Sequence, residues 1–511
     1  MKKWIAIVFV LALTAGLAAP SAYAASPAQW KSSIVLANPN GGGAENLGIS
    51  VTLKFSDGGP SDVPDQPINP YGSLEFNYGV TENFKGSAEI SANQPVAAVY
   101  RQFPGGVDQS YAPILYTAFS ANQASDSGYF IPTFVRRSDV STLIGIQNID
   151  GSAATLNLRF FKVGNKTGTP DYILDNFDIS EYSSRQIGGV DFSALPGFPA
   201  SFDGSLVISL QNPSCSDCGK RIVVAAQEIP NSGRRAYAFE GVPDTKVENA
   251  DPTKPAYWYM RQTYMPSAMC KVGRTQQTSY YAVQNAGAEP AFIIVDYYDN
   301  NGKKIATQKS VKVYPGAKVS INTCSARGMG GKSGSAVIYA DLDGKTSQNA
   351  TTKKYEYTPG GYIAAMGKVI SNDGLATAFT APGSGSSQLS LPYIPWGAST
   401  YDYRAYIAVF NPSKTESATV EISYYTREGC GSTSTPIPGC TAKKHKFVVK
   451  PNGKGNSTPL LGGALTGGSF IGSAVVTSDK PVVVLVRVQK ATKVKGYTTL
   501  GEDYTGVQLA P

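Results

Sequence analysis

The feature that most constrains this chain is a sequence pattern that occurs four times along it. In each copy a short apolar run ends at an Asn, a polar loop follows, and a second run alternates apolar and polar residues. The third copy reads YYAVQNAGAEPAFIIVDYYDNNG over residues 280–302, and the fourth reads YIAVFNPSKTESATVEISYYTREG from residue 406. The Asn residues of the four copies are Asn38, Asn148, Asn285 and Asn411. Period-two alternation is typical of strands with one buried face, and an Asn side chain can hydrogen-bond the backbone of the turn that follows.

A second signature follows the first in every copy. A Gly-Ser pair opens another strand, in the segments KGSAEI, DGSLVI, SGSAVI and IGSAVV, and a further apolar strand comes after it. Three copies then show an Ala-Phe step, at Phe119, Phe239 and Phe379, and a Pro-containing segment is interpreted as the close of each unit. Two signatures that recur in the same order predict a tandem repeat.

We therefore predict an all-β chain of four tandem immunoglobulin-like β-sandwich units, each of about 100 residues. The unit boundaries are placed at 25–131, 132–265, 266–394 and 395–511. A high content of Gly, Pro and Tyr, with 16% charged residues, suits strands and turns better than helices. Ile294 lies on the outer face of its strand, so we expect a neighbouring element to cover that face.

Residues 1–24 are expected to be a cleaved signal peptide. Two lysines precede an apolar stretch, and Ala22-Tyr23-Ala24 provides a small-residue cleavage site. The rest of the chain has no apolar run near the roughly 20 residues that span a bilayer, so no transmembrane segment is expected. The mature protein is predicted to be secreted or held at the cell surface.

Charge and motif chemistry narrow the function further. The formal net charge is +8, but the charges are scattered, whereas a nucleic-acid footprint needs a concentrated basic stripe. The segment Ala326–Ser333 is close to a phosphate-binding loop, yet a strand follows it in place of the required helix. Asp299–Gly302 and Asp341–Gly344 could supply calcium ligands, but they lack the twelve-residue loop and match hairpin turns.

Catalytic chemistry has little support in the sequence. The single histidine, His445, lies in a basic strand-like segment, so a Ser or Cys nucleophile lacks its usual base elsewhere. A carboxylate pair of a glycosidase remains an alternative, and the sequence does not select one. We assign no catalytic, cofactor-binding or metal-ligating residue.

The six cysteines respect the predicted boundaries, with two in each of units 2, 3 and 4. In an exported chain this distribution predicts disulfides, which we pair as Cys215–Cys218, Cys270–Cys324 and Cys430–Cys440. Cys215 and Cys218 could alternatively form a redox motif, but strands flank them where a helix would be required.

An aromatic cluster is the candidate binding surface. It consists of Tyr257, Trp258, Tyr259 and Tyr264, and exposed rings of this kind can stack on sugars. The alternative is that these rings cover the joint between units 2 and 3.

Taken together, the Asn-turn pattern, the double aromatics and the Gly-Ser strand starts resemble the tandem immunoglobulin-like repeat proteins of the bacterial cell surface. The resemblance implies a non-catalytic extracellular structural or adhesive protein, built as a rod of four units, in a surface layer, filament or biofilm matrix. Alternatives are a carbohydrate-binding protein and a polysaccharide-active enzyme. Expected partners are surface glycans or the protein itself, since stacking of unit 4 on unit 1 of another copy would build head-to-tail filaments.

Overall fold

The structure is a computed structural model of the full chain. It describes residues 4–8, 30–40, 49–55, 63–78, 87–104, 113–120, 123–189, 192–193, 195–211, 221–230, 235–244, 261–348, 355–397, 403–432, 435–436, 442–491 and 499–509. The regular secondary structure of these residues is almost exclusively β-strand, and the short 3-10 turn η2 (Thr323–Ser325) lies between two strands of the third unit. Among them, no helix has the length and hydropathy needed to cross a bilayer.

The described strands build four units, and each unit pairs two sheets. The A sheet holds the fourth, third, sixth and first strands of a unit, and the B sheet holds its fifth, second, seventh and eighth strands. In unit 2 the A sheet is β13 (Tyr172–Ile179), β12 (Ala154–Lys162), β15 (Phe202–Leu210) and β10 (Gly128–Arg136), and the B sheet is β14 (Ser184–Gly188), β11 (Val140–Asn148), β16 (Ile222–Pro230) and β17 (Tyr237–Glu240). The two sheets of this unit are continuous at one corner, where β10 pairs with β11 at Arg136 and Ser141. The short β18 (Val242–Pro243) pairs with β10.

Unit 1 repeats this order. Its A sheet is β4 (Val63–Ile68), β3 (Ile49–Phe55), β6 (Ala88–Ala92) and β1 (Trp4–Val8), extended by β9 (Phe119–Ser120), and its B sheet is β5 (Ser73–Tyr78), β2 (Trp30–Ala37), β7 (Ala97–Pro104) and β8 (Ile114–Thr117).

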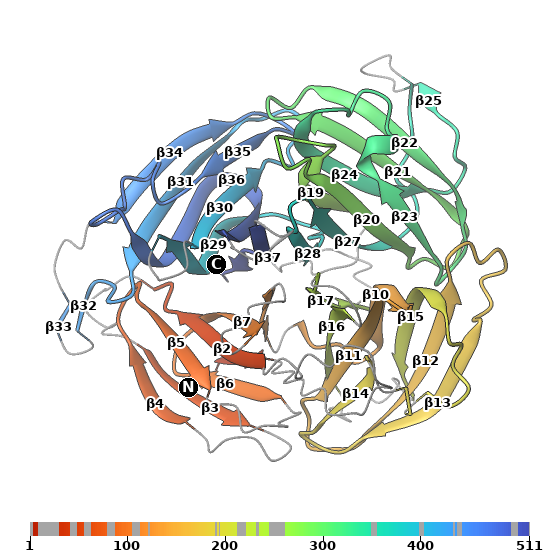
Figure 1. The fold of residues 1–511 in the computed structure, drawn as a ribbon, viewed down its shortest axis with the longest axis horizontal. Helices are drawn as coiled ribbons and strands as arrows, with labels where there is room; N and C mark the ends of the chain where they lie inside the picture. Colours follow the sequence, from red (N-terminus) through yellow and green to blue (C-terminus); the bar gives the residue numbers. More distant parts are fainter. Residues whose placement is uncertain are drawn as a thin grey trace.

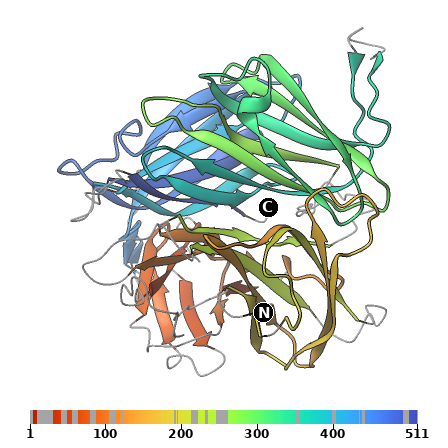
Figure 2. The ribbon, with the colours of Figure 1, turned by 45° about the vertical axis from the view of Figure 1, so that its right-hand side comes forward.

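Unit 3 has the same strand order as unit 2. Its A sheet is β22 (Lys304–Val313), β21 (Ala291–Asp299), β24 (Ser333–Asp341) and β19 (Gln262–Met269), and its B sheet is β23 (Lys318–Asn322), β20 (Thr278–Asn285), β27 (Ile363–Ile370) and β28 (Ala376–Thr380). A hairpin of β25 (Ser347–Gln348) and β26 (Tyr355–Glu356) projects from this unit (Figures 1 and 2).

In unit 4 one long strand, β36 (Phe470–Ala491), serves both sheets. Around it lie β34 (Lys443–Val449), β31 (Ala418–Thr426) and β29 (Ser386–Trp396) in the A sheet, and β35 (Lys454–Ser457), β30 (Tyr403–Phe410) and β37 (Thr499–Thr505) in the B sheet. β38 (Val507–Gln508) pairs with β29, and β32 (Gly431–Ser432) pairs with β33 (Thr435–Pro436). The predicted all-β class and four two-sheet units are confirmed, and the likeness to immunoglobulin-like units is one of sandwich architecture.

The repeated Asn residues organise the turn that follows the second strand of each unit. All four are buried, and in every unit the side-chain oxygen accepts a hydrogen bond from the backbone N–H two residues later. The side-chain N–H groups donate to backbone carbonyls, as Asn285 does to Glu289 and Val313 at 2.8 and 2.9 Å. A buried polar side chain with all its partners supplied holds a single turn geometry, which explains why this residue recurs.

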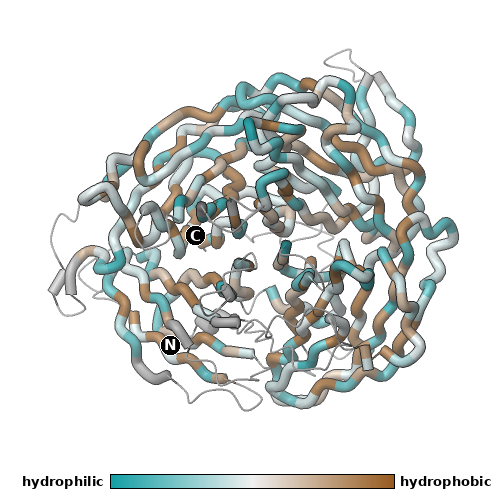
Figure 3. Tube along the Cα trace, in the orientation of Figure 1, coloured by the Kyte–Doolittle hydropathy of each residue, from teal (hydrophilic) through white to brown (hydrophobic). Residues whose placement is uncertain are grey.

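The alternating strands fold as predicted, because one face meets the unit's own core and the other meets a neighbour. In β12 buried and partly exposed residues alternate from Ala154 onward, and Figure 3 shows the same mixing of hydrophobic and hydrophilic positions along the chain. Ile294, on the far face of β21, is buried against Phe410 and Val483 of unit 4. The expectation that a neighbour covers this face is confirmed.

The four units close into a ring, which corrects the predicted rod. Figure 1 shows them around a common centre, where β8 contacts β17, β17 contacts β28, β28 contacts β37 and β37 contacts β8. The A sheet of each of units 2, 3 and 4 faces the B sheet of the next unit, with unit 1 following unit 4. The A sheet of unit 4 and the B sheet of unit 1 therefore contact each other within one chain, where the sequence analysis expected unit 4 to stack on unit 1 of another copy.

The Pro-containing segments begin units, although the sequence suggested that they end them. The predicted boundaries at 131/132, 265/266 and 394/395 fall inside β10, β19 and β29, each of which pairs with the Gly-Ser strand of the following unit. The prolines Pro132, Pro266 and Pro392 lie where the register of these pairings shifts. Because proline cannot donate to a ladder, a bulge is the position that tolerates it.

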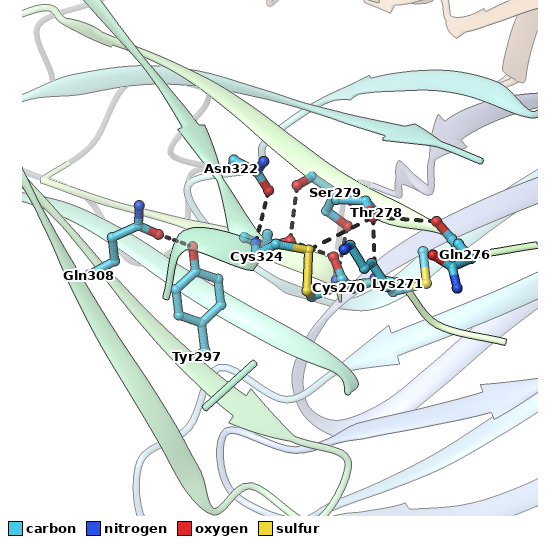
Figure 4. The surroundings of a disulfide bond; sticks show 11 residues. Cys270, Lys271, Gln276, Thr278, Ser279, Tyr297, Gln308, Asn322 and Cys324 are labelled. Atoms are coloured by element: carbon cyan, nitrogen blue, oxygen red, sulfur yellow. Dashed lines mark hydrogen bonds between the residues drawn. A yellow bond between two sulfur atoms is a disulfide. The ribbon is translucent and has the colours of Figure 1, made fainter. Parts of the chain in front are cut away.

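One of the three predicted disulfides lies fully within the described residues. Cys270, which follows β19, is bonded to Cys324 in η2, with 4.9 Å between their Cα atoms (Figure 4). Around it Thr278 hydrogen-bonds the Lys271 N–H, and the Asn322 side chain accepts from the Cys324 N–H. Cys430 is also disulfide-bonded, whereas Cys215, Cys218 and Cys440 lie outside the described residues.

Candidate functional site: the axial hub and the seams

The centre of the ring is built from the last B-sheet strand of each unit, β8, β17, β28 and β37, which we call the axial hub. Strand register aligns the units residue by residue: Val99 pairs with Thr117, Ala225 with Glu240, Met366 with Thr380 and Leu485 with Thr505. The same register makes Tyr116, Phe239, Phe379 and Tyr504 equivalent. The Ala-Phe step predicted at Phe119 is therefore out of register by three residues.

Glu240 is the acidic member of the central layer formed by Thr117, Glu240, Thr380 and Thr505. Its carboxylate accepts a hydrogen bond of 2.6 Å from the Thr117 N–H, and its backbone carbonyl accepts one of 2.7 Å from the Thr380 hydroxyl. Thr117 in turn donates to the Thr505 carbonyl at 3.1 Å. Burial raises the pKa of Glu240. This one layer ties all four units together by hydrogen bonds.

Ion pairs surround the hub where neighbouring units meet. Arg101 of unit 1 pairs with Glu502 of unit 4 at 2.8 Å, and Lys368 of unit 3 pairs with Glu228 of unit 2 at 2.5 Å. Within unit 4, Arg487 pairs with Asp503 at 2.7 Å, and that carboxylate also accepts from Thr377 of unit 3. Arg101, Lys368 and Arg487 occupy equivalent positions in their strands, and Gln227 holds that position in unit 2. The charges at this position thus pair across seams or within a unit.

Burial shifts the pKa values of two groups at the junction of units 4 and 1. It raises the pKa of the Glu502 carboxyl to about 7, against the opposing effect of the Arg101 guanidinium. Burial, followed by the charge of Arg101, lowers the pKa of the Lys490 ammonium to about 8. Both groups are nearly inaccessible to water, at 2% and 5% exposure, and desolvation disfavours the charged form of each.

The seams between units are formed by the repeat signatures themselves. The Ser of the Gly-Ser pair donates to a turn carbonyl of the next unit: Ser205 to Gly316, Ser335 to Asn452, and Ser473 to Tyr71. The accepting residues all have positive φ. The preceding glycine is required because an added Cβ would overlap a backbone carbonyl of the neighbouring strand, as Gly334 would with Tyr298.

The double aromatics have divided roles. The first ring, Tyr297 for example, is buried in the core of its own unit, and the second contacts the next unit. Tyr425 of unit 4 stacks on Tyr71 of unit 1, with 4.2 Å between ring centroids and 8° between planes. Stacking in this offset or parallel geometry adds about 0.5–1.5 kcal/mol beyond area burial, so the pair contributes to ring closure.

A cavity of about 70 Å³ lies beside the hub, where units 1, 3 and 4 meet. Its walls include Thr117, Gln123, Ser384, Val484 and Thr505. Such a volume holds a few water molecules, since each water in the liquid occupies about 30 Å³. It is therefore a feature of the junction and too small for a substrate of ordinary size.

The sequence-predicted aromatic surface is only partly visible. Tyr257, Trp258 and Tyr259 lie outside the described residues. Tyr264 lies on β19, is partly buried, hydrogen-bonds the Gln262 side chain, and has its ring centroid 5.7 Å from that of Phe410 in unit 4. Its ring thus contributes to a joint between units, and the joint is that of units 3 and 4.

The motifs with alternative functional interpretations fold as turns and strands. Ser333 begins β24, as expected of a strand start. The Asp299 carboxylate accepts from the Asn301 and Lys303 N–H groups, and Asp341 accepts from the Gly344 and Thr358 N–H groups. His445 lies on the exposed strand β34 and hydrogen-bonds Ser457. Among the described residues no group of three His, Cys, Asp or Glu side chains gathers as metal ligands do.

Sequence reasoning missed the hub and the seams. Arg101 and Glu240 stand in largely apolar strands, Glu502 stands in the strand TLGEDYT, and none of the three belongs to a recognisable motif. One sequence feature could have indicated the seams, namely the Gly that ends the segments YYDNNG and YYTREG. Gly302 and Gly429 have positive φ, and an added Cβ would overlap Pro451 in the next unit and the Pro70–Gly72 turn of unit 1, respectively. A Gly recurring at a fixed distance from a double aromatic indicates such a close approach.

Comparisons with known proteins do not show a family. No family model matches the sequence, and no curated protein matches it. A structure of Thermotoga maritima 1070 aligns with 25% of this chain and 97% of its own, at 16% identity and a TM-score of 0.19. A tetra-tandem repeat from the extending region of a large adhesion protein aligns over 91% and 92%, at 12% identity and a TM-score of 0.10. The RrgB pilus protein of Streptococcus pneumoniae aligns over 96% and 89%, at 9% identity and a TM-score of 0.12. Likenesses at these TM-scores carry no argument about this chain.

Proposed function

We propose that the protein is a non-catalytic extracellular structural or adhesive protein whose body is a closed ring. This proposal is supported by the contacts of the repeated residues, which lie within the chain. The buried Asn residues, the Gly-Ser pairs and the double aromatics maintain turns and seams. Residues that recur from unit to unit and make intramolecular contacts are typical of a scaffold, in which binding is left to variable outer surfaces.

The outer strands offer such surfaces. Residues of β22 and β34 at the rim are largely exposed and rich in lysine, and the chain there shows alternation of exposed and half-buried positions. The Cys270–Cys324 disulfide fits an oxidising compartment. A closed ring with polar outer strands suits display at a cell surface or within a surface layer or matrix.

The test is fractionation of cells that produce the protein, combined with activity assays on the purified chain from Ala25. The proposal expects the protein in the surface or medium fraction and no turnover on a panel of chromogenic glycosides. A cytoplasmic location would overturn the extracellular role. Sustained glycoside turnover would instead support the polysaccharide-active alternative.

A carbohydrate-binding function is favoured by one observation. On unit 4 the rings of Trp396 and Tyr406 meet at 5.7 Å, the Arg404 guanidinium lies 5.5 Å from the Trp396 ring, and Tyr406 is 39% exposed. Aromatic faces with an adjacent hydrogen-bond donor are suited to sugars. A glycan array with the Y406A variant tests this, with Y280A as the control, because Tyr280 holds the equivalent position of unit 3. Binding lost in Y406A and retained in Y280A supports the site.

A further inference from the structure

The first strand of every unit occupies the same place in its sandwich. β10 pairs with the Gly-Ser strand β15 and with β18 at the end of its unit, and β29 pairs in the same way with β36 and β38. β19 pairs with β24, and the Tyr264 N–H donates to the carbonyl of Pro382 near the end of unit 3. The first strand is thus held between the Gly-Ser strand and a segment near the end of its own unit.

In unit 1 this place is taken by β1, a strand from the predicted signal peptide. β1 pairs antiparallel with β6 over five residues, from Trp4 opposite Ala92 to Val8 opposite Ala88. It also pairs with β9, where Ala6 and Ile7 face Ser120 and Phe119. The leader segment therefore completes unit 1 as β10 and β29 complete theirs.

Removal of residues 1–24 would leave unit 1 without a first strand. Only residues 25–29 then precede β2, which begins at Trp30, whereas β10 alone spans nine residues. The mature N-terminus is too short to run the length of a first strand and return to start the second. The backbone groups of β6 and β9 that face β1 would be left without their ladder partners.

We propose that unit 1 of the mature protein is a strand-acceptor site. Its ligand is an extended, uncharged apolar segment of a partner polypeptide, at least five residues long, which adds antiparallel to β6 and reaches β9. We name this place the β6–β9 slot. The inference rests on removal of the leader, which the export in the proposed function implies, and its test reads strand pairing directly, so the two proposals can fail separately.

The physical argument comes from the two sides of β6. Its other edge is already paired with β3 from Val51 to Phe55, and with β1 in place Ala88, Ile90 and Ala92 are buried. An open edge beside a formed core is a template for strand addition. In such complexes main-chain hydrogen bonds supply affinity and alternate side chains supply specificity. The sequence WIAIV of the strand seated there defines the ligand as uncharged and rich in β-branched residues.

The test uses the mature chain, residues 25–511, and a synthetic peptide that carries WIAIV between lysine pairs for solubility. Amide hydrogen exchange is followed with and without peptide. At a peptide concentration of 100 Kd, exchange of the β6 and β9 amides through the open slot is expected to slow about 100-fold. Protection of β15 and β24, which have their own first strands, is expected to stay constant and shows that the remaining units are folded.

The matched control is the same peptide with the A6P substitution. Ala6 faces both Ile90 and Ser120, and proline at that position removes a donor and disfavours strand pairing. The control peptide should therefore protect β6 at least tenfold less. Self-association of the mature chain that the WIAIV peptide reverses would also support the slot, and would identify a second copy as the occupant.

Two results would overturn the proposal. One is a β6 strand in the mature chain that is as well protected without peptide as β15 is, since the chain itself would then fill the slot. The other is equal protection by the two peptides, because binding would then not depend on strand pairing.

Discussion

The seam between units 2 and 3 and the seam between units 4 and 1 share the same hydrogen bond but differ in how the chain connects the two units. In both, the Ser of a Gly-Ser pair donates to a positive-φ turn, at 2.7 Å from Ser205 to Gly316 and 3.1 Å from Ser473 to Tyr71. At the first seam the chain runs directly from one unit into the next. At the second seam the two ends of the chain meet, and Arg101 pairs with a residue 401 positions away.

We call the seam between units 4 and 1 the closing seam, because it completes the ring. Its central ion pair is more deeply buried than that of the seam between units 2 and 3. Arg101 and Glu502 have side chains only 6% and 0% exposed, compared with 17% and 3% for Lys368 and Glu228 at the seam of units 2 and 3. Each of the two seams has a second ion pair, Arg427 with Glu75 at the closing seam and Lys318 with Asp203 at the seam of units 2 and 3. The cost of closing a flexible loop rises only with the logarithm of its length. A long intervening chain is therefore compatible with closure when the seam itself is specific.

The largest expected effect comes from breaking the buried pair of the closing seam. R101M leaves Glu502 buried without its cation, and loss of one partner in such a pair costs about 3–5 kcal/mol. K368M should cost less, because its pair retains more contact with water. Urea unfolding of both variants measures the difference. The double variant R101M/E502L should recover most of the stability, and equal losses in R101M and K368M would remove the proposed distinction between the seams.

The glycines that follow the double aromatics provide the next comparison. G429A at the closing seam and G302A at the seam of units 3 and 4 each place a Cβ into a backbone group of the next unit. Overlap and positive φ together should destabilise each by about 3 kcal/mol. The control is G463A, at φ 63° with no atom near the added Cβ, for which about 1 kcal/mol is expected from φ alone. Thermal unfolding that ranks G463A with the other two would contradict the close approach of the turns.

The shifted pKa of Lys490 should make the stability of the closing seam depend on pH. Because the folded pKa of Lys490 is about 8, below the unfolded value of 10.5, the unfolded chain binds more protons between these values. Stability therefore rises with pH across this window, by about 2 kcal/mol for one group. This contribution is absent in K490M, so the stability of the wild type relative to K490M should increase between pH 8 and 10. A constant difference in urea titrations would show that Lys490 keeps its ordinary pKa.

The smallest effects should come from the seam hydrogen bonds. S205A and S473A each remove one donor to a turn carbonyl, and a typical bond of this kind contributes about 1 kcal/mol. Similar losses would show that the closing seam and the continuous seam depend equally on the repeated Ser. Hydrogen exchange at the turns around Gly316 and Tyr71 locates each effect. A loss confined to S473A would instead mean that chain continuity replaces the bond between units 2 and 3.

Much of the local structure could be predicted because it depends on short-range chemistry. The side-chain oxygen of the Asn at the end of each second strand accepts from the backbone two residues later, and the alternation in β12 requires only one buried face. The same Asn side chain also donates to a carbonyl far along the chain, as Asn285 does to Val313, and that contact depends on the fold of the unit. The Cys270–Cys324 bond was predicted from the even distribution of cysteines among units. The predicted unit boundaries fall inside β10, β19 and β29 because a Pro-containing strand can either end one sandwich or begin the next. The local sequence pattern is the same in both cases.

By itself, the sequence determined the strand class, the fourfold repeat and the positions of the turns, since each follows from residue spacing and from the local hydrogen bond that the Asn oxygen accepts. The ring, the axial hub and the partners of Arg101, Glu240 and Glu502 were decided only by the tertiary structure. When one face of a strand packs in its own core, the local sequence does not show whether the other face contacts water or another unit. Whether that face closes a ring depends on the small rotation from unit to unit, and only the packed sheets set that rotation.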